Sequence, residues 1–479
     1  MLRRTLPLVL AAMLSAFALM ISGSSAQAAP VTVTNATQFT DTTGAVVHAH
    51  GGGVIKVGAY YYWFGENRDP DNTFKAVSVY RSTDLKTWEF RNNALTQSSD
   101  PELAVANIER PKVIYNSTTG KYVMWMHKEN GSDYAQARVA VAVSDTVDGD
   151  YTYKGSFRPP TGTTSRDMTL FQDSDGTAYQ ITSANNNADL QIFKLSADYT
   201  SYDSLVANPW PGIFREAPAL FKRNGAYFML TSGNSGWNPN QQKYATATSI
   251  TGPWTAFTDI GDATAYGSQT AFVLPVQGTQ GTSYLYMGDR WGNSTGGTVN
   301  DSQYVWLPLT FPTKTTMDLP WYPQVSIDTD AGTISGVGGG PYYNLTARHS
   351  DKCLDVSDNS SADNATAIQY ACNGGLNQQW RLQDAGDGYV RVLAQHSGKC
   401  LDVANASTAD GAYVNQYHCT TGTNQEWSFQ DQGGGYNQLV ARHSGKCLDV
   451  ANASTANGAR LIQWPCGTQA NQQFKRSTV

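Results

Sequence analysis

Short stretches in which apolar and polar residues alternate run through the first two thirds of the chain. Examples are VSVYRS at 77–82 and RVAVAVS at 138–144, and turn sequences such as DSDG at 173–176 and RNG at 223–225 lie between such stretches. Alternation with a period of two is typical of β-strands. No long amphipathic helical pattern interrupts these stretches, so the pattern predicts an all-β fold.

One hairpin pattern recurs five times in this region. Each copy begins at a charged or amide-bearing residue, continues into an apolar strand and reaches an aromatic strand with a Gly-x-Tyr-like segment. The copies start, 49 to 59 residues apart, at His50, Glu109, Asp167, Glu216 and Gln269. This spacing is the size of one four-stranded propeller blade, so we expect a five-bladed β-propeller over residues 30–333. Because the innermost strands surround one axis, the last four starting residues should meet in one pocket, and converging carboxylates are what glycoside hydrolysis requires.

The first 28 residues have a different character. Arg3 and Arg4 precede an apolar run at 6–21, and the small-x-small sequence AQA follows at 26–28. This order is that of a secretory signal peptide, so we expect residues 1–28 to be removed and the protein to be secreted and extracellular. A membrane anchor is the weaker alternative, because the run is short for a bilayer span.

The number and distribution of charged residues limit the kinds of binding partner that we expect. The net charge is −6, only 15% of residues are charged, and Lys and Arg are scattered along the chain. Nucleic-acid binding requires a basic face that neutralises phosphates, so we expect no nucleic-acid partner. We also expect no membrane partner, no cofactor and a monomer. The 12 Trp and 26 Tyr residues fit both a propeller core and surfaces on which sugars stack.

The last third of the chain repeats itself three times. The copies, which follow one another with a period of 47 residues, are RHSDKCLDV at 348–356, QHSGKCLDV at 395–403 and RHSGKCLDV at 442–450. All six cysteines lie here, and in each copy the second follows the first after 19 residues. In an exported protein the repeat symmetry favours three bridges, Cys353–Cys372, Cys400–Cys419 and Cys447–Cys466. A zinc site is the alternative, but C-x-x-C spacing and nearby histidine pairs are absent from the sequence. The glycine-rich stretch 334–340 is predicted to be a flexible linker before this second domain.

Each copy closes with Asn-Gln-x-aromatic, as NQQW at 377–380, NQEW at 424–427 and NQQF at 471–474. With this motif, residues 341–479 resemble the ricin-B type β-trefoil, carbohydrate-binding module family 13. The resemblance implies three sugar sites, each with an aspartate, an aromatic ring and an asparagine: Asp355, Tyr370 and Asn377; Asp402, Tyr417 and Asn424; Asp449, Trp464 and Asn471. A further polar residue of the family pattern is present only in the second copy, as Asn415, so we favour the second site and leave the others open. The closing aromatic residues are expected in the trefoil core.

Residues 31–330 resemble glycoside hydrolase family 43, and in particular its exo-β-1,3-galactanase branch. The motifs that carry this resemblance are AHGGG at 49–53, ERPKVIYN at 109–116, YVMWMH at 122–127, SRDMTLF at 165–171 and REAPALF at 215–221. The family implies an inverting mechanism, in which an acid and a base lie on opposite sides of the sugar and leave room for one water.

The resemblance assigns catalytic roles to two carboxylates. Glu216 matches the general acid, and the alternative is a structural glutamate paired with Arg215. Asp167 matches the residue that tunes and orients the acid, and the alternative is a pair with Arg166. Carboxylates with perturbed pKa values gather at active sites but also occur in ion pairs, so both alternatives have to be weighed.

The catalytic base is open. Most of the family has an aspartate at the start of the first blade, whereas this chain reads VHAHGGG there. The galactanase branch relies instead on positions that match Glu109 and Gln269. Gln269 would either act as base in its imidic tautomer or position the water. Glu109 would either act as the base or bind sugar hydroxyls. The remaining positions that we expect to contact sugar are Glu66, His50, Tyr134, an asparagine of the run 185–187, represented by Asn186, and Trp237. For His50 and Gln269 a structural role is equally open, and Trp237 can equally belong to an ordinary turn.

Three functions therefore compete. The first is an exo-β-1,3-galactanase that degrades the β-1,3-galactan backbone of arabinogalactan while its trefoil holds the polymer. The second is another family 43 enzyme that acts on arabinosyl or xylosyl polymers, against which the missing aspartate argues. The third is a galactan-binding lectin without activity. A metal site at His48 and His50 is a weaker hypothesis, because H-x-H alone is a poor metal signal, and we predict no metal.

Overall fold

The structure is a computed structural model that describes residues 29–311, 313–337, 341–360 and 362–479. The signal peptide predicted at 1–28 lies outside these residues. Among the described residues, none of the helices combines the length and the apolar character needed to cross a membrane. The helical elements there are short 3-10 turns: η1 (Pro101–Leu103), η2 (Gly292–Thr295), η3 (Val299–Asp301), η4 (Ser357–Asn359), η5 (Leu376–Gln378), η6 (Ala404–Ala406), η7 (Thr423–Gln425), η8 (Ala451–Ala453) and η9 (Ala470–Gln472).

Five successive antiparallel sheets form most of the first domain in the described chain. Four of them have four strands each: β2 (His50–Val57), β3 (Tyr60–Arg68), β4 (Phe74–Ser82) and β5 (Glu89–Thr96); β6 (Asn107–Asn116), β7 (Lys121–Glu129), β8 (Arg138–Ser144) and β9 (Thr152–Phe157); β10 (Met168–Gln172), β11 (Ala178–Ala184), β12 (Asp189–Leu195) and β13 (Tyr202–Ala207); β14 (Arg215–Arg223), β15 (Ala226–Gly233), β16 (Gln242–Ala247) and β17 (Thr258–Ile260). The fifth has three strands, β18 (Gln269–Gly278), β19 (Gly281–Arg290) and β20 (Gln303–Leu309).

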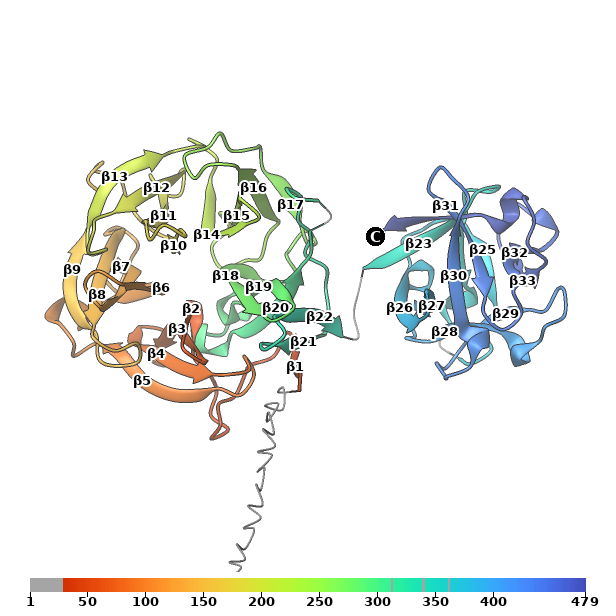
Figure 1. Cartoon of the computed structure of the whole chain (residues 1–479), viewed down its shortest axis with the longest axis horizontal. Helices are drawn as coiled ribbons and strands as arrows, with labels where there is room; N and C mark the ends of the chain where they lie inside the picture. The colour runs from red at the N-terminus through yellow and green to blue at the C-terminus, as the bar shows by residue number, and fades with distance from the viewer. Residues whose placement is uncertain (1–28, 312, 338–340, 361) are drawn as a thin grey trace, which may run out of the picture.

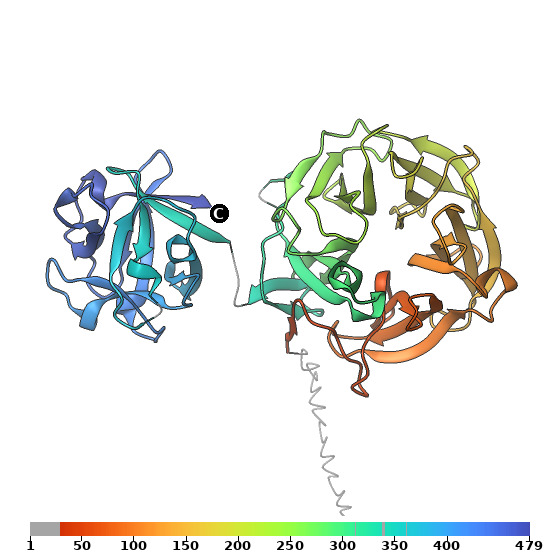
Figure 2. The same cartoon turned by 180° about the vertical axis from the view of Figure 1, so that it is seen from behind.

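These sheets form a propeller. The first strand of each sheet contacts the first strand of the next, and β18 contacts β2, which closes the ring. Figure 1 shows the five sheets around one axis, and Figure 2 shows the same ring from behind. Apolar and aromatic side chains fill the space between neighbouring sheets; Trp63, Trp88 and Trp306, for example, are fully buried in one cluster. Burial of such large apolar surfaces is the main force that holds the sheets together.

The predicted linker is wrong in its first half. Residues 333–337 form β22 (Thr333–Val337), which pairs with β21 (Gln324–Asp328), and β21 pairs with β1 (Val31–Thr34). A Cβ atom on Gly336 would lie 1.8 Å from the ring of Tyr322. Glycine therefore leaves room here for the Tyr322 ring to pack against the strand. Residues 338–340 lie outside the described residues.

The second domain is a β-trefoil. Its strands are β23 (Tyr342–Ala347), β24 (Cys353–Val356), β25 (Ala367–Tyr370), β26 (Trp380–Gly386), β27 (Tyr389–Ala394), β28 (Cys400–Val403), β29 (Val414–Tyr417), β30 (Glu426–Asp431), β31 (Tyr436–Ala441), β32 (Cys447–Val450), β33 (Ala459–Trp464) and β34 (Phe474–Thr478). Pairing runs β23–β26–β27–β30–β31–β34 and returns to β23, which closes a barrel. The hairpins β24–β25, β28–β29 and β32–β33 complete the three repeats.

Two expectations for this domain are confirmed. The disulfides are Cys353–Cys372, Cys400–Cys419 and Cys447–Cys466. The closing aromatic residues Trp380, Trp427 and Phe474 lie together in the buried core, as their repeat positions predict.

Candidate active site

The residues predicted to meet at the axis stand at the starts of the innermost strands. His50 and Gln269 are the first residues of β2 and β18, Glu216 is the second of β14, Glu109 is the third of β6, and Asp167 directly precedes β10. The innermost strands share one axis, so residues far apart in sequence are brought to the same end of the propeller.

Bulges directly follow both glutamates of this set. The register with the neighbouring strand shifts between Glu109 and Lys112 and between Glu216 and Ala219. Arg110 and Ala217, inside the bulges, have positive φ angles of 55° and 49°. A non-glycine residue adopts this conformation only at a cost of about 1–2 kcal/mol. Such bulges are frequent beside active sites, where they change the direction of a side chain.

A cavity of about 200 Å³ opens at this end of the axis. Its lining contains both acidic side chains and aromatic rings: Glu66, Glu109, Arg110, His127, Tyr134, Arg166, Asp167, Asn187, Glu216, Asn234, Gly236, Trp237, Gln269 and Trp291. The four predicted catalytic residues are all present, as are Glu66, Tyr134 and Trp237. Carboxylates beside aromatic rings in a concave site are suited to a sugar, because they combine hydrogen bonding with an apolar wall.

Glu216 is a buried carboxyl group with a strong tendency to hold its proton. Burial raises its pKa to about 8, and the nearby charge of Asp167 acts in the same direction, whereas Arg110 opposes it. Its two oxygens accept hydrogen bonds from the Asn187 side-chain amide at 3.1 Å and the Gln269 side-chain amide at 3.0 Å. Arg215, the alternative partner, donates instead to Thr231.

Asp167 pairs with Arg110 rather than with Arg166. The Arg110 guanidinium donates to both Asp167 oxygens, at 3.3 and 3.1 Å. The carboxylate also accepts the backbone N–H of Ala217 at 3.1 Å, directly beside Glu216. Asp167 therefore fixes the bulge that carries Glu216 and raises the pKa of the Glu216 carboxyl.

All hydrogen-bonding atoms of the Gln269 side chain have partners. Its Oε1 accepts from Arg110 at 2.5 Å and from the Trp291 indole at 2.8 Å. Its Nε2 donates to Glu216 at 3.0 Å and to Ser232 at 2.9 Å. The two donors at Oε1 determine which end of the amide is the oxygen. In this arrangement Gln269 orients Glu216 and Arg110.

Glu109 is held in its ionised form. Burial by itself would raise its pKa, but a hydrogen bond from His127 and the charge of Arg68 lower the pKa well below its usual value. Its oxygens contact Arg68 at 2.9 Å, the Tyr134 hydroxyl at 2.7 Å and His127 at 3.1 Å.

One group among the described residues has ligand atoms close enough for a metal ion, namely Glu109, His127 and Asp167. His127, however, lies between the carboxylates of Glu109 and Glu129. Burial alone would lower its pKa, but these two partners raise it to about 9. Both ring nitrogens of His127 are thus within hydrogen-bond distance of a carboxylate, and the three side chains form a buried chain Glu109–His127–Glu129.

Two predicted sugar-binding residues lie outside the cavity lining. His50 is fully buried, and its Nδ1 is 3.0 Å from the Asp289 carboxylate while its ring stacks on Tyr304. Asn186 accepts from Arg166 at 3.3 Å, and it is the next residue, Asn187, that lines the cavity and donates to Glu216. Asn187 belongs to the asparagine run 185–187 in which a sugar contact was expected, and all three residues of the run have positive φ angles.

Sequence analysis missed three lining residues that organise the site. Arg110 joins Asp167 and Gln269, Trp291 donates to Gln269 and lies under the Arg110 guanidinium, and His127 fixes Glu109. Arg110 and His127 lie inside the quoted motifs ERPKVIYN and YVMWMH, so the motifs were the available signal. Trp291 lies just after β19, where no motif had been noted.

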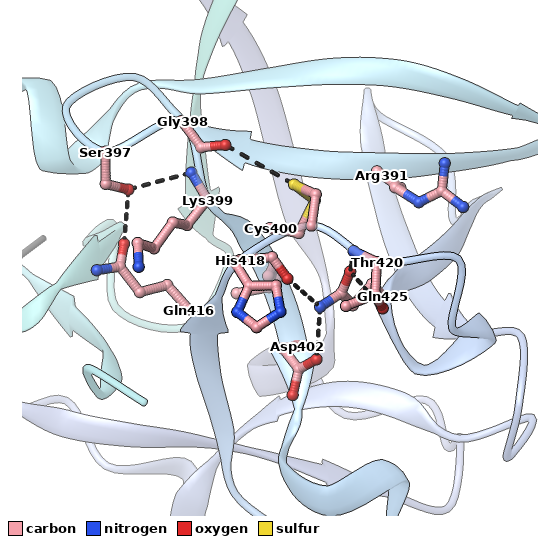
Figure 3. The surroundings of a disulfide bond; sticks show 12 residues. Arg391, Ser397, Gly398, Lys399, Cys400, Asp402, Gln416, His418, Thr420 and Gln425 are labelled. Atoms are coloured by element: carbon pink, nitrogen blue, oxygen red, sulfur yellow. Dashed lines mark hydrogen bonds between the residues drawn. A yellow bond between two sulfur atoms is a disulfide. The ribbon is translucent and has the colours of Figure 1, made fainter. Parts of the chain in front are cut away.

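The trefoil places the predicted sugar-binding residues of each repeat near one another. In all three repeats the asparagine amide donates to a valine carbonyl, of Val356, Val403 and Val450. The Asn377 amide also donates to Asp355 at 3.0 Å, and the Asn424 amide to Asp402 at 2.8 Å. In each repeat the glutamine after the asparagine also donates to the aspartate. Figure 3 shows Gln425 between the His418 carbonyl and Asp402, beside the second disulfide.

The three aromatic platforms differ in exposure. Tyr370 is 41% exposed and Trp464 is 46% exposed. Tyr417 is half-buried, and its ring centroid lies 4.3 Å from that of His418. Asn415 is opposite Asp402 in the β28–β29 register, so the second repeat has an additional polar group on the same face but a less open ring.

Comparison with known proteins agrees with the fold and the site. The model of glycosyl hydrolases family 43 matches residues 50–266, and that of the ricin-type beta-trefoil lectin domain matches residues 341–474. A propeller with an acidic axial pocket and a lectin-type second domain defines a glycoside hydrolase with a carbohydrate-binding module.

Two solved structures are similar over most of their length. An exo-beta-1,3-galactanase from Clostridium thermocellum is 49% identical, with 94% of this chain and 100% of that chain covered and a TM-score of 0.66. An exo-beta-1,3-galactanase from Phanerochaete chrysosporium, solved with galactose, is 30% identical, with 94% and 93% covered and a TM-score of 0.60. None of the curated proteins matches the chain. The chain belongs to glycosyl hydrolases family 43.

Proposed function

We propose that the protein is a secreted, inverting exo-β-1,3-galactanase that hydrolyses the β-1,3-galactan backbone of arabinogalactan, and that the trefoil holds it on the polymer. The observation that carries this proposal is Glu216, a buried carboxyl group with a pKa of about 8 in a cavity lined by acidic and aromatic residues. The two similar galactanases support the substrate. The cavity is smaller than the roughly 300–1,000 Å³ of drug-sized ligand sites, which suits one terminal sugar and hence exo cleavage.

In this mechanism Glu216 is protonated at neutral pH and gives its proton to the glycosidic oxygen as the bond breaks. Asp167 keeps the pKa of Glu216 high, and Gln269 and Asn187 orient the carboxyl group. We assign the base role to Glu109, because it is a carboxylate that stays ionised, whereas Gln269 has its amide hydrogens and oxygen occupied.

Glu109 is a weak base, since three donors stabilise its charge. A weak base is sufficient if positive charge develops on the sugar ring before the attacking water loses its proton, as an oxocarbenium-like transition state implies. Tyr134 and Arg68 then hold Glu109 in place, and Trp237 and Trp291, whose ring centroids are 5.2 Å apart, form an apolar wall.

The test compares wild type, Glu216→Gln and Glu109→Gln on β-1,3-galactan and on a dinitrophenyl β-galactoside, whose leaving group needs no protonation. Glu216→Gln should lose at least about 10³-fold on galactan but much less on the aryl substrate, whereas Glu109→Gln should lose activity on both. NMR of the wild-type reaction should show α-galactose as the first product.

A wild-type protein that binds galactan but releases no galactose would overturn the proposal in favour of the lectin hypothesis. Release of β-galactose would contradict the inverting mechanism. Equal losses for Glu216→Gln on the two substrates would contradict the acid role. Release of arabinose or xylose, but no galactose, from the corresponding polymers would favour the second family 43 activity.

A further inference from the structure

A second cavity, which we call the rear cavity, lies on the propeller axis behind the active site. Its volume is about 770 Å³. Its lining includes later residues of all five innermost strands, namely 53–56 of β2, 112–115 of β6, 170–172 of β10, 220–222 of β14 and 272–275 of β18. The active-site residues stand at the starts of these same strands, so the two cavities lie at successive levels of one axis.

Lys112 occupies the level between the two cavities. It lines the rear cavity and is only 2% exposed. Its ammonium group donates to the Gly51 carbonyl at 2.6 Å, and the Arg110 carbonyl oxygen lies 3.5 Å away. Gly51 and Arg110 belong to the parts of β2 and β6 where the register with the next strand shifts. One amine therefore joins the interruptions of two neighbouring blades.

These two interruptions support part of the active-site wall. A Cβ atom on Gly51 would lie 2.4 Å from Glu66 Oε1 and 3.4 Å from Arg110 Cδ, so the Gly51 backbone packs directly against both side chains. The same Glu66 oxygen accepts the Arg110 backbone N–H at 3.0 Å. Glu66 and Arg110 both line the active-site cavity. Arg110 in turn contacts Asp167 and Gln269, so a displacement of Gly51 would reach the groups around the acid.

An amine at this place has an energetic cost. Burial lowers the pKa of Lys112 to about 7, and the charge of Arg110 acts in the same direction. The carboxylates that oppose this shift are Glu66, Asp167 and Asp289. An apolar side chain of similar length, such as methionine, would fill the same volume without this cost. The hydrogen-bonding group of Lys112 is therefore the part whose role a substitution should test.

We propose that Lys112 is a positioning residue that joins the interruptions of β2 and β6 behind the active site and thereby holds Glu66 and Arg110 in place. This inference rests on the proposed function and adds to it a residue outside the lining of the active-site cavity. Misplacement of a catalytic group by about 1 Å can reduce the rate by about 10²-fold, so loss of this contact should be visible in kcat/KM.

The first test is Lys112→Met, with Lys56→Met as the matched control. Methionine is of similar length but donates no hydrogen bond, so kcat/KM on galactobiose should fall by about 10²-fold. Arg110 lowers the pKa of Glu216, so a displaced Arg110 should move the fall of kcat/KM at alkaline pH to higher pH, by about 0.5 unit. Lys56 lines the same rear cavity, but its ammonium group lies over the Tyr61 ring, so its substitution should leave both quantities unchanged.

The second test uses Lys112→Ala, which opens space toward the rear cavity. n-Propylamine replaces the atoms that are removed, so it should increase kcat/KM of this variant by at least about 10-fold. Tetramethylammonium carries the same charge but has no N–H group, and it should restore no activity. Calorimetry with and without each amine ensures that the assays are made below the melting temperature of the variant.

Three results would overturn the positioning role. The first is a folded Lys112→Met whose kcat/KM is within about 2-fold of wild type. The second is a loss of activity without a shift of the pH profile and without rescue of Lys112→Ala by propylamine, which would mean that Lys112 only stabilises the fold. The third is failure of both variants to fold, which would mean the same. In all three cases wild-type activity would stand, so the proposed function would survive, whereas a wild type inactive on galactobiose would overturn both.

Discussion

At the scale of single residues, the site is a set of charges whose mutual distances decide their protonation. Glu216 is buried beside Asp167, and both effects favour its neutral form. Glu109 is equally buried, but Arg68 and His127 favour its charged form. Two glutamates in one cavity are thereby driven to opposite protonation states, which is the requirement for an acid and a base to act together.

The pH dependence of activity should follow Glu216. The acid works only when protonated, so kcat/KM on galactobiose should fall as the pH rises through about 8. Asp167→Asn removes a charge that raises this pKa and frees Arg110, which lowers it, so the alkaline limb should move to lower pH by about one unit.

The measurement is kcat/KM on galactobiose between pH 5 and 10, with Asp173→Asn as the control. Asp173 is a carboxylate directly after the end of β10 that pairs with Lys222 and is not part of the cavity lining. An alkaline limb that stays in place in Asp167→Asn would show that Asp167 does not tune the acid.

At the scale of the elements, the innermost strands pair with their neighbours along most of their length, but the pairing is interrupted where they reach the active site. In β2 the interruption is the run of glycines 51–53, where the register with β3 shifts. A Cβ atom on Gly52 would lie 1.6 Å from the Phe64 carbonyl oxygen. The backbones of β2 and β3 can approach this closely only without a side chain.

Gly52→Ala should therefore destabilise the propeller by several kcal/mol, since the overlapping atom belongs to the backbone and cannot rotate away. Gly58→Ala is the control, because nothing lies within 4 Å of its Cβ position. Its φ of 60° is unfavourable for alanine, so this substitution should lower the stability by about 1 kcal/mol. Calorimetric unfolding of both variants gives the comparison. Equal melting temperatures would contradict the close approach.

At the scale of the whole molecule, the two domains are stabilised by different means. The propeller has large apolar clusters and no cysteine, whereas the trefoil holds all six cysteines in three disulfides. A disulfide that closes a loop of this length contributes about 3 kcal/mol, chiefly by restricting the unfolded chain.

Reduction should consequently act on one domain. Dithiothreitol should lower the melting temperature of the trefoil by more than about 10 °C and leave that of the propeller unchanged, as followed by calorimetry with and without reductant. Hydrolysis of the aryl galactoside under the same conditions is the control, because it needs only the propeller. A parallel shift of both transitions would contradict separate stabilisation.

The trefoil should bind polymer through its open aromatic rings. In the inactive Glu216→Gln background, Trp464→Ala should weaken retention on insoluble galactan by at least about 3-fold, and Tyr417→Ala should have a smaller effect because His418 covers part of that ring. Tyr436→Ala, a half-buried ring away from these positions, is the control. If Tyr417→Ala has the larger effect, the second repeat is the main site, as its additional Asn415 predicts.

Much of this architecture was predictable because it depends on short-range patterns. The period of two predicts strands, the repeat of 49 to 59 residues predicts blades, and the 47-residue repeat with paired cysteines predicts a trefoil and its disulfides. Closure of the propeller brings the innermost strands together, so Glu109, Asp167, Glu216 and Gln269 could be placed in one cavity from their positions alone.

Only the tertiary structure decided which neighbours these residues have. The structure shows that Arg110 rather than Arg166 pairs with Asp167 and that His50 is buried. It also shows which asparagine of the run 185–187 reaches Glu216, namely Asn187. The same holds for the strand at 333–337, where glycine serves close packing. Sequence periodicity determines on which face of a strand each residue lies. Hydrogen bonds and pKa values depend instead on the direction and distance of side chains that come from elements far apart in the chain.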